Sequence, residues 1–363
     1  MAPKSAVIIF SLWLVALPAR AVIFASTGDG GYNTNAPGGA LTNSGWQYEG
    51  QWATYFLGTP IAPTFFLAAQ HVGGSPGQVF VLNGFNYHTV AYTDSTNSDL
   101  RIWQVAETFP YYAPMFSATN EAGQHCVAIG RGTQRGVPVI VNGQTNGWEW
   151  GFTDSVERWG ENDVASIEND PGLGDFLRCT FDRNAPTTNE CHLSGGDSSG
   201  ALFIQDGAAW KLAGIHYGVD GQFSFYSNGS NAFHAPLMDM RGLYIYQGNN
   251  TWTLISTNQP FAEPSGFYST RVSAHLGWIN SVIHFQPGAD LRITAVTRTN
   301  DDMQIDFATG TNRLYRLDRT DDIATGSWTT MTNNLTGNGG IMSITDPAAA
   351  DLPQRFYRLR LNP

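Results

Sequence analysis

Short apolar or β-branched runs, each broken by glycine, asparagine or proline, are the feature that most limits how this chain can fold. From residue 46 to about 218 the chain alternates such breaks with FFLAA, GQVFVL, RIWQV, VAIG, VPVIV, ALFI and KLAGI. Runs of this length indicate short strands joined by turns rather than a helical bundle. The composition agrees, because 40 glycines and 18 prolines accompany a charged fraction of only 13%. The pattern predicts an all-β fold built as a barrel or a sandwich.

The balance of charge limits the classes of partner. The chain has 19 basic and 30 acidic residues, for a net charge of −11, and it contains no basic run. A protein that binds nucleic acid or an anionic membrane would present a positive patch. We therefore expect no nucleic-acid partner and no membrane partner.

The amino terminus has the organisation of an export signal. Lys4 provides the charged flank, Ala6 to Leu17 form an apolar run, and Ala19-Arg20-Ala21 supplies the small residues of a cleavage site. The alternative, a membrane anchor, is weaker because the run is too short to span the hydrocarbon core comfortably. We predict a signal peptide over residues 1–21 and a secreted protein, extracellular or periplasmic.

Three cysteines are too few for a disulfide scaffold, but an oxidising compartment favours pairing two of them. Cys179 and Cys191 are close in sequence and bracket the polar stretch TFDRNAPTTNE, so we predict a disulfide between them. Cys126 lies in an apolar strand pattern and is expected to be a buried, unreactive thiol. No spacing resembles a zinc site, and we expect neither a metal nor a cofactor.

The carboxyl-terminal part of the chain differs in pattern from the rest. An amphipathic helix is predicted from Ser273, with the serine at the cap position and closure near Phe285 to Gly288. After Gly288, segments such as MQIDFA and RFYRLRL alternate with the two-residue period of half-exposed strands. We interpret residues 289–363 as a small β-sandwich module, the alternative being that these strands extend the first domain. Residues 222–263 are aromatic and irregular, and we interpret them as a long insertion whose role the sequence does not show.

Three segments stand in the order expected of one catalytic site. They are APTFFLAAQHVGG with His71, NSDLRIWQV with Asp99, and LSGGDSSGALF with Ser198. Each alone is weak, because a histidine at a strand end, an aspartate before a strand and a serine in a glycine-rich turn are usually structural. Together, in the order His, Asp, Ser, they match the chain order of one family of hydrolases and not those of subtilisins or α/β-hydrolases.

The chemistry of acyl transfer explains the choice of residues. A serine hydroxyl is a poor nucleophile at neutral pH, and the imidazole of His71 can take its proton and return it to the leaving group. A buried carboxylate at Asp99 would hold one tautomer of the imidazole and stabilise the imidazolium. Gly196, which lacks a Cβ, allows its own N–H and that of Ser198 to point at one developing oxyanion.

The segments resemble the chymotrypsin-like, or trypsin-like, family of serine endopeptidases over roughly residues 46–288. AAQH is similar to the family's Ala-Ala-His segment, and SDLRIWQV is similar to its Asp-Ile-Ala-Leu strand. GGDSSGALF is similar to the family's Gly-Asp-Ser-Gly-Gly-Pro turn. PSGFYSTRVSAHLGWINSVI is similar to its closing strand and C-terminal helix. The resemblance implies two antiparallel six-stranded β-barrels with a C-terminal helix, in a protease domain over residues 22–288. It also implies hydrolysis of a protein or peptide substrate through an acyl-enzyme, with no cofactor.

Two residues depart from the family's turn. Ser199 stands where the family usually has glycine, and Ala201 where it usually has proline. Two adjacent hydroxyls are thus candidates for the nucleophile, and the register with Asp197 favours Ser198. The family often buries a new amino terminus against this aspartate, and cleavage after Ala21 would expose Val22, whose docking there is a further hypothesis.

The resemblance also places a primary substrate pocket. It would be formed around His192, by His216, Tyr217 and Gly218, and by Gly266 at its back. His192 stands where a trypsin has aspartate, so a basic side chain would find no counter-ion. GIHYG is similar to the Gly-Ile-His-Trp-Gly of staphylococcal-type glutamyl endopeptidases, which predicts a preference for glutamate or aspartate at the cleaved bond. The alternative is that His216 is a strand residue with a satisfied ring.

A different class of function remains open on the sequence alone. The chain could be a catalytically inactive homologue that acts as an adhesion or binding protein. In either case the C-terminal module could bind a glycan or another surface ligand, or could only stabilise the chain. We interpret the remaining histidines, His234 among them, as structural.

Overall fold

The computed structural model describes residues 22–283, 292–309, 314–338 and 340–361. The predicted signal peptide over 1–21, the predicted end of the helix near Phe285 to Gly288 and the predicted boundary at 288/289 lie outside the described residues.

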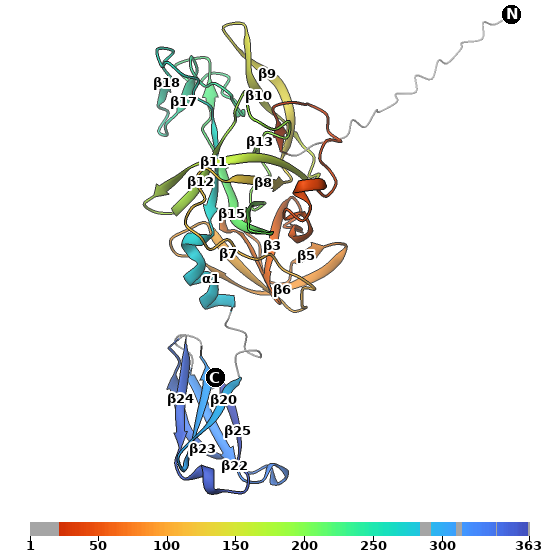
Figure 1. Ribbon diagram of the computed structural model, residues 1–363. Helices are drawn as coiled ribbons and strands as arrows, with labels where there is room; N and C mark the ends of the chain where they lie inside the picture. Colours follow the sequence, from red (N-terminus) through yellow and green to blue (C-terminus); the bar gives the residue numbers. More distant parts are fainter. Residues whose placement is uncertain (1–21, 284–291, 310–313, 339, 362–363) are drawn as a thin grey trace, which may run out of the picture.

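Two closed six-stranded barrels of antiparallel strands form the centre of the molecule (Figure 1). The first barrel closes in the order β2 (Gly50–Trp52), β3 (Phe56–Ala62), β4 (Phe65–Ala69), β7 (Leu100–Val105), β6 (Phe85–Asp94), β5 (Val79–Leu82). The second closes in the order β11 (Arg158–Asp170), β12 (Gly174–Thr180), β19 (Gly266–Arg271), β15 (Ala209–Val219), β14 (Ala201–Asp206), β8 (His125–Gly130). The predicted all-β fold with two six-stranded barrels is confirmed.

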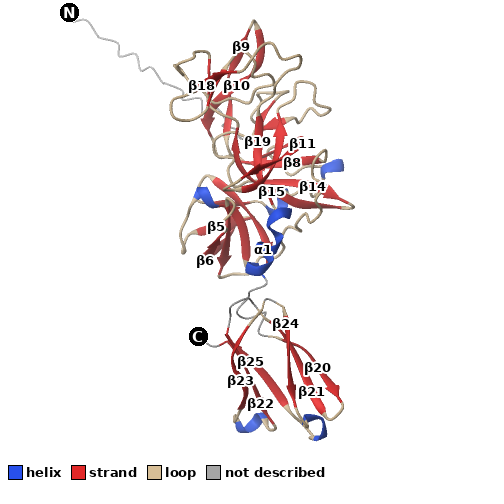
Figure 2. Ribbon diagram, turned by 90° about the vertical axis from the view of Figure 1, so that its left-hand side faces the viewer, coloured by secondary structure: helices blue, strands red, loops and turns tan. Residues whose placement is uncertain are grey.

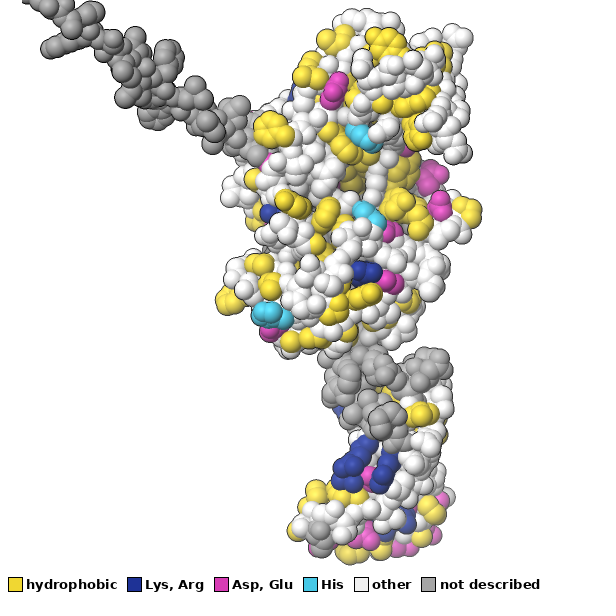
Figure 3. Space-filling view, turned by 180° about the vertical axis from the view of Figure 1, so that it is seen from behind, with side chains coloured by type: hydrophobic (Ala, Val, Ile, Leu, Met, Phe, Trp, Pro, Cys, Tyr) yellow, Lys and Arg dark blue, Asp and Glu magenta, His cyan; other side chains and the backbone are white. Residues whose placement is uncertain are grey.

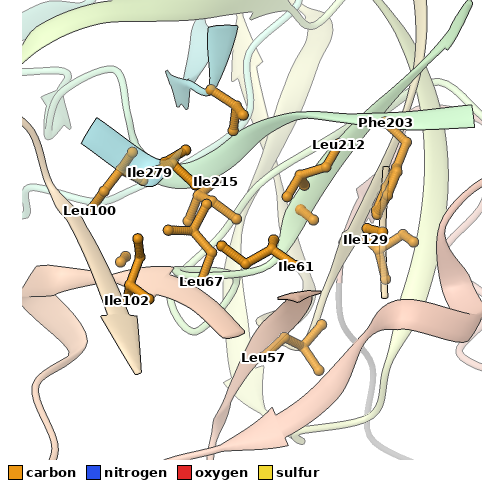
Figure 4. Close-up of a cluster of buried hydrophobic side chains, with 14 of the residues drawn as sticks. Leu57, Ile61, Leu67, Leu100, Ile102, Ile129, Phe203, Leu212, Ile215 and Ile279 are labelled. Carbon is orange, nitrogen blue, oxygen red and sulfur yellow. The ribbon is translucent and has the colours of Figure 1, made fainter. Parts of the chain in front are cut away.

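An apolar seam joins the two barrels. We use this name for the buried cluster drawn in Figure 4, to which both barrels contribute. Leu57 and Leu67 enter it from the first barrel, and Phe203 and Ile215 from the second, and each is at most 1% exposed. Burial of this kind contributes roughly 2 kcal/mol for each large aliphatic or aromatic side chain. The seam therefore fixes the barrels against each other.

The helix predicted from Ser273 is present, but it begins three residues later, at Leu276. Ser273 opens a short 3₁₀ turn, and α1 follows at Leu276–Ile283, with Ile279 buried in the seam. The prediction that Ser273 caps the helix is wrong, because its hydroxyl donates to Glu121, which also holds Arg271. No helix in the described ranges is long and apolar enough to cross a membrane.

The irregular insertion forms a small sheet that packs on a two-stranded hairpin outside the barrel ladders. β16 (Phe223–Ser224), β17 (Tyr244–Tyr246) and β18 (Trp252–Leu254) pair in that order. Their buried side chains share one apolar cluster with the hairpin of β9 (Thr133–Val141) and β10 (Gln144–Thr153). Leu237 also bridges to Gly147 of the hairpin. Insertion and hairpin are thus one packed unit.

The first described residues form a two-residue strand that pairs with another short strand. β1 (Ile23–Phe24) pairs antiparallel with β13 (Cys191–His192), so that Ile23 lies opposite His192. Val22, Ile23 and Phe24 are all buried.

The strands after residue 292 form two three-stranded sheets with their own core (Figure 2). One is ordered β20 (Ile293–Thr299), β21 (Asp302–Ala308), β24 (Ile341–Asp346), and the other β23 (Thr329–Thr336), β22 (Leu314–Thr320), β25 (Phe356–Leu361). Figure 3 shows basic side chains gathered on these sheets and sparse on the barrel face in view. Three arginines, Arg316, Arg358 and Arg360, surround the buried carboxylate of Asp318.

Glu190 gives the fold a measurable pH dependence. Burial raises the pKa of this 4% exposed carboxyl group to about 8, from an ordinary value near 4.5. Between these values the folded protein retains a proton that the unfolded chain has released, so the free energy of unfolding falls as the pH rises from 5 to 8. In the wild-type protein we expect the free energy of unfolding to fall by an amount on the order of 3 kcal/mol over this range. Glu190→Gln should not show this fall when urea unfolding is measured at both pH values. Glu168→Gln, at an exposed position of β11, should leave the loss unchanged, and an equal loss in Glu190→Gln would contradict the assignment.

Candidate active site

His71 and Asp99 form a closely bonded pair at the edge of the first barrel. β4 ends at Ala69 and the chain turns at once into a 3₁₀ turn, Gln70–Val72, that carries His71. Nδ1 of His71 lies 2.6 Å from Oδ2 of Asp99, and the His71 backbone N–H donates to Oδ1 of the same carboxylate at 2.9 Å. Asp99 is 5% exposed and stands immediately before β7, the neighbour of β4. The carboxylate thus fixes both the ring and the backbone of the histidine.

The turn before β14 presents Ser198 with two backbone donors. Gly196 has φ of +101°, a conformation that favours glycine and lets the chain reverse here. In the described part of the chain, neither the N–H of Gly196 nor that of Ser198 donates a hydrogen bond. Two unbonded N–H groups, two residues apart on one tight turn, match the requirement for an oxyanion site.

The two adjacent serines have different environments. Ser198 is half-buried and lines a cavity, and its Oγ has no hydrogen-bond partner among the described residues. Ser199 is fully buried, and its Oγ accepts a hydrogen bond from the Ala69 N–H at 2.9 Å. The geometry therefore favours Ser198 as the hydroxyl that can reach a substrate.

Contacts across the seam place the serine turn beside the histidine. The bond from Ala69 to Ser199 joins the residue two before His71 to the residue after Ser198. The ring of Tyr217, which lines the same cavity as Ser198, meets the ring of His71 edge-on with centroids 5.8 Å apart. These contacts place the Ser198 turn next to the segment that carries the His71–Asp99 pair, while no hydrogen bond joins the Ser198 hydroxyl to His71 among the described residues.

Of the predicted pocket residues, some line this cavity and others do not. The cavity has a volume of about 200 Å³, and its lining includes Ser198, His216, Tyr217 and Gly218. His192 and Gly266 are not part of that lining. His192 is 1% exposed, with Nδ1 2.7 Å from the Leu193 carbonyl oxygen and Nε2 3.4 Å from the Ser265 hydroxyl.

His216 is a lining residue of the cavity, with a fully buried ring. Its Nδ1 lies 2.8 Å from the hydroxyl of Ser269, while its buried Nε2 has no hydrogen bond in the described chain. Burial lowers the pKa of His216 to about 3, against a smaller opposing effect of the Ile129 carbonyl. The ring is therefore neutral at ordinary pH. If the Ser269 hydroxyl donates to Nδ1, the proton of the imidazole is on Nε2, as a free donor.

The carboxylate of Asp197 has internal partners. Its Oδ1 accepts from the Gly132 N–H, and its Oδ2 accepts from the N–H and the hydroxyl of Ser194, all within 3.0 Å. Burial raises the pKa of Asp197 to about 6. Docking of an amino terminus, hypothesised from the sequence, is not needed to satisfy this carboxylate. Ile23 and Phe24 pair instead with β13.

The sequence did not reveal one wall of the cavity. Trp150 of β10 lines it, and the Trp150 ring stacks on His234 of the insertion with centroids 4.4 Å apart and planes at 15°. The backbone N–H of Trp150 also donates to the His234 carbonyl oxygen at 2.9 Å. His234, interpreted above as merely structural, thus supports a residue of the site. No motif signals this pair, because β10 and the insertion are far apart in sequence.

The predicted disulfide between Cys179 and Cys191 is wrong. All three cysteines are free and buried. Cys179 lies on β12 opposite Val164 and Phe267, and its neighbouring sulfur is that of Cys126, 3.9 Å away across β11. Closeness in sequence was a poor guide here, because the barrel ladders decide which side chains meet.

Among the residues that the structure describes, no group of three or more histidine, cysteine, aspartate or glutamate side chains could hold a metal ion.

Comparison with models of protein families and with curated proteins found no match. Comparison with solved structures found similar folds. An inactive form of Rv3671c from M. tuberculosis H37Rv, a serine-to-alanine mutant, is 14% identical with a TM-score of 0.38, over 68% of this chain and 96% of that one.

Two further structures are similar to the same extent. Kallikrein-related peptidase 10 in complex with Zn²⁺ is 14% identical with a TM-score of 0.39, over 69% of this chain and 100% of that one. Neuropsin, a serine protease expressed in the limbic system of mouse brain, is 13% identical with a TM-score of 0.38, over 66% and 96%.

The number of free thiols can be measured by alkylation. Burial raises the pKa of the Cys179 and Cys191 thiols well above the ordinary value, so we expect the native protein to resist iodoacetamide at neutral pH. After unfolding in guanidinium without a reductant, the intact mass should show three alkylated cysteines. A single alkylated cysteine would show a disulfide and would contradict the structure.

Proposed function

We propose that this chain is a secreted serine endopeptidase that uses His71, Asp99 and Ser198. The observation that carries the proposal is the His71–Asp99 pair, with Nδ1 2.6 Å from Oδ2. It lies beside a turn on which the Ser198 hydroxyl and the N–H groups of Gly196 and Ser198 have no hydrogen-bond partner in the described chain. In such an arrangement the histidine activates the hydroxyl as a nucleophile, and the two N–H groups stabilise the oxyanion that forms beside it.

The reaction follows from the roles of the three side chains. Oγ of Ser198 attacks the carbonyl carbon of the peptide bond while Nε2 of His71 takes its proton, and the oxyanion is bound by the N–H groups of Gly196 and Ser198. When the C–N bond breaks, His71 returns the proton to the departing amine and leaves an ester on Ser198. A water molecule, deprotonated by His71, then attacks the ester and releases the carboxylic acid.

The wall of the cavity supports a preference for acidic residues at the cleaved bond. The buried Nε2 of His216 has no hydrogen bond in the described chain and can donate to a carboxylate that reaches it. Within the lining of this cavity the one carboxylate, that of Asp197, is occupied by Ser194 and Gly132 and is not free to pair with a basic side chain. The stacked Trp150 limits the width of the cavity. The substrate we propose is a protein or peptide with glutamate or aspartate at this position.

The strands after residue 292 supply none of the described site residues. We propose for them an accessory role, either in binding a glycan or another surface ligand or in stabilising the chain. An inactive homologue that serves as a binding protein is the second candidate function. It is favoured only by the altered turn at Ser199 and is excluded if Ser198 reacts.

Covalent labelling tests the proposed function. A fluorophosphonate forms a stable bond only with an activated serine, so we expect it to label the protein lacking residues 1–21 at Ser198, identified by peptide mass spectrometry. Ser198→Ala and His71→Ala should lose the label, whereas Ser199→Ala should keep it on Ser198. Absence of label on the folded wild-type protein would favour the binding-protein alternative.

A set of peptides that differ only in the cleaved residue tests the preference. We expect kcat/KM for glutamate or aspartate to exceed that for leucine, phenylalanine or lysine by at least about tenfold, because only a carboxylate can use the free Nε2 of His216. His216→Gln should reduce this ratio. His275→Gln changes another buried histidine, outside the cavity lining, and should leave it intact. A clear preference of the wild-type enzyme for aromatic or aliphatic residues would refute the acidic assignment.

A further inference from the structure

Ser199 adopts a backbone conformation that serine rarely uses. Its φ is +68°, in the left-handed region that glycine enters freely and other residues avoid. The residue is fully buried. Unfavourable backbone conformations persist only where surrounding contacts hold them, and such positions concentrate at functional sites.

The contacts that hold Ser199 reach into both barrels. Its N–H donates to the carbonyl oxygen of His216 on β15 at 2.9 Å. Its Oγ accepts from the N–H of Ala69, the last residue of β4, also at 2.9 Å. A glycine would satisfy the backbone but could not accept the second bond.

Ala69 still pairs with Leu100 of β7, but it lies beyond the last residue of β4 that pairs with β3. The pairing of β3 with β4 stops at Thr59 opposite Leu67, two residues earlier. Ala69 is completely buried, and a buried N–H without a partner is costly. The hydroxyl of Ser199 supplies the acceptor that β3 no longer provides.

This bond differs in kind from the other links between the barrels. The seam is apolar, and apolar contacts fix separation without fixing direction. A hydrogen bond requires a defined distance and angle. It joins the residue after Ser198 to the residue two before His71, and the His71 N–H and ring are both tied to Asp99.

We propose that Ser199 is a positioning residue, which sets the distance from Ser198 to His71 through its hydrogen bond with the Ala69 N–H. This inference rests on the proposed function, since it concerns the reactivity of Ser198. It gives a role to the serine that distinguishes this turn from the usual Gly-Asp-Ser-Gly sequence.

The rate of fluorophosphonate labelling at Ser198 tests this proposal with three variants. Ser199→Ala removes the acceptor and keeps the Cβ, Ser199→Gly removes the acceptor and relieves the backbone, and Ser199→Cys keeps a weak acceptor. We expect the alanine and glycine variants to label about 10- to 100-fold more slowly than wild type, with the cysteine variant between them and wild type. With a cleaved peptide, kcat should fall while KM stays near the wild-type value, because the side chain of Ser199 is not part of the cavity lining.

Ser155 provides a matched control. It is also a serine with positive φ, +57°, and its hydroxyl has no hydrogen bond within the described ranges. Ser155→Ala and Ser155→Gly should label at the wild-type rate. Hydrogen exchange gives a second readout, since the Ala69 amide should exchange faster in Ser199→Gly and Ser199→Ala than in wild type.

The outcomes separate this proposal from the proposed function. Wild-type labelling at Ser198 with an equal rate in a folded Ser199→Gly would overturn the role of Ser199 and leave the protease assignment in place. A slower rate that merely follows a lower melting temperature, with Ala69 exchange unchanged, would also overturn it. No labelling of wild type would remove the proposed function, and the role of Ser199 with it.

Discussion

The apolar seam between the two barrels is the interaction on which the site depends. No single barrel contains all three candidate catalytic residues, because His71 and Asp99 lie at the edge of the first and Ser198 on a turn of the second. Closed ladders make each barrel internally rigid, so the remaining freedom is the movement of one barrel against the other. Close packing of the seam removes most of that freedom.

Polar contacts within each barrel hold the residues of the candidate site in place. The carboxylate of Asp99 holds the histidine from within the first barrel, and donors from Gly132 and Ser194 hold Asp197 within the second. Both carboxylates are almost fully buried, so each is stable only with its bonds formed. Local folding and site geometry are therefore coupled on both sides of the seam.

The sequence predicts this molecule best where the signal is local. Strand rhythm and the order His71, Asp99, Ser198 lie within short segments, and the all-β architecture follows from them. The prediction of a disulfide between Cys179 and Cys191 was wrong, because the pairing of the strands and not distance in the sequence places Cys179 beside Cys126. The wall formed by Trp150 was not predicted either, since packing of the insertion on β10 depends on irregular aromatic residues that follow no period.

The stacking of Trp150 on His234 has a consequence for how the molecule can diverge. The aromatic wall of the cavity is supported from a surface insertion that belongs to neither barrel ladder. Substitutions or length changes between residues 222 and 263 can therefore tilt or withdraw the indole while every ladder and every catalytic contact stays intact. The support of this aromatic wall and the His71–Asp99 pair therefore lie on separate parts of the chain, so a change in the first leaves the second in place.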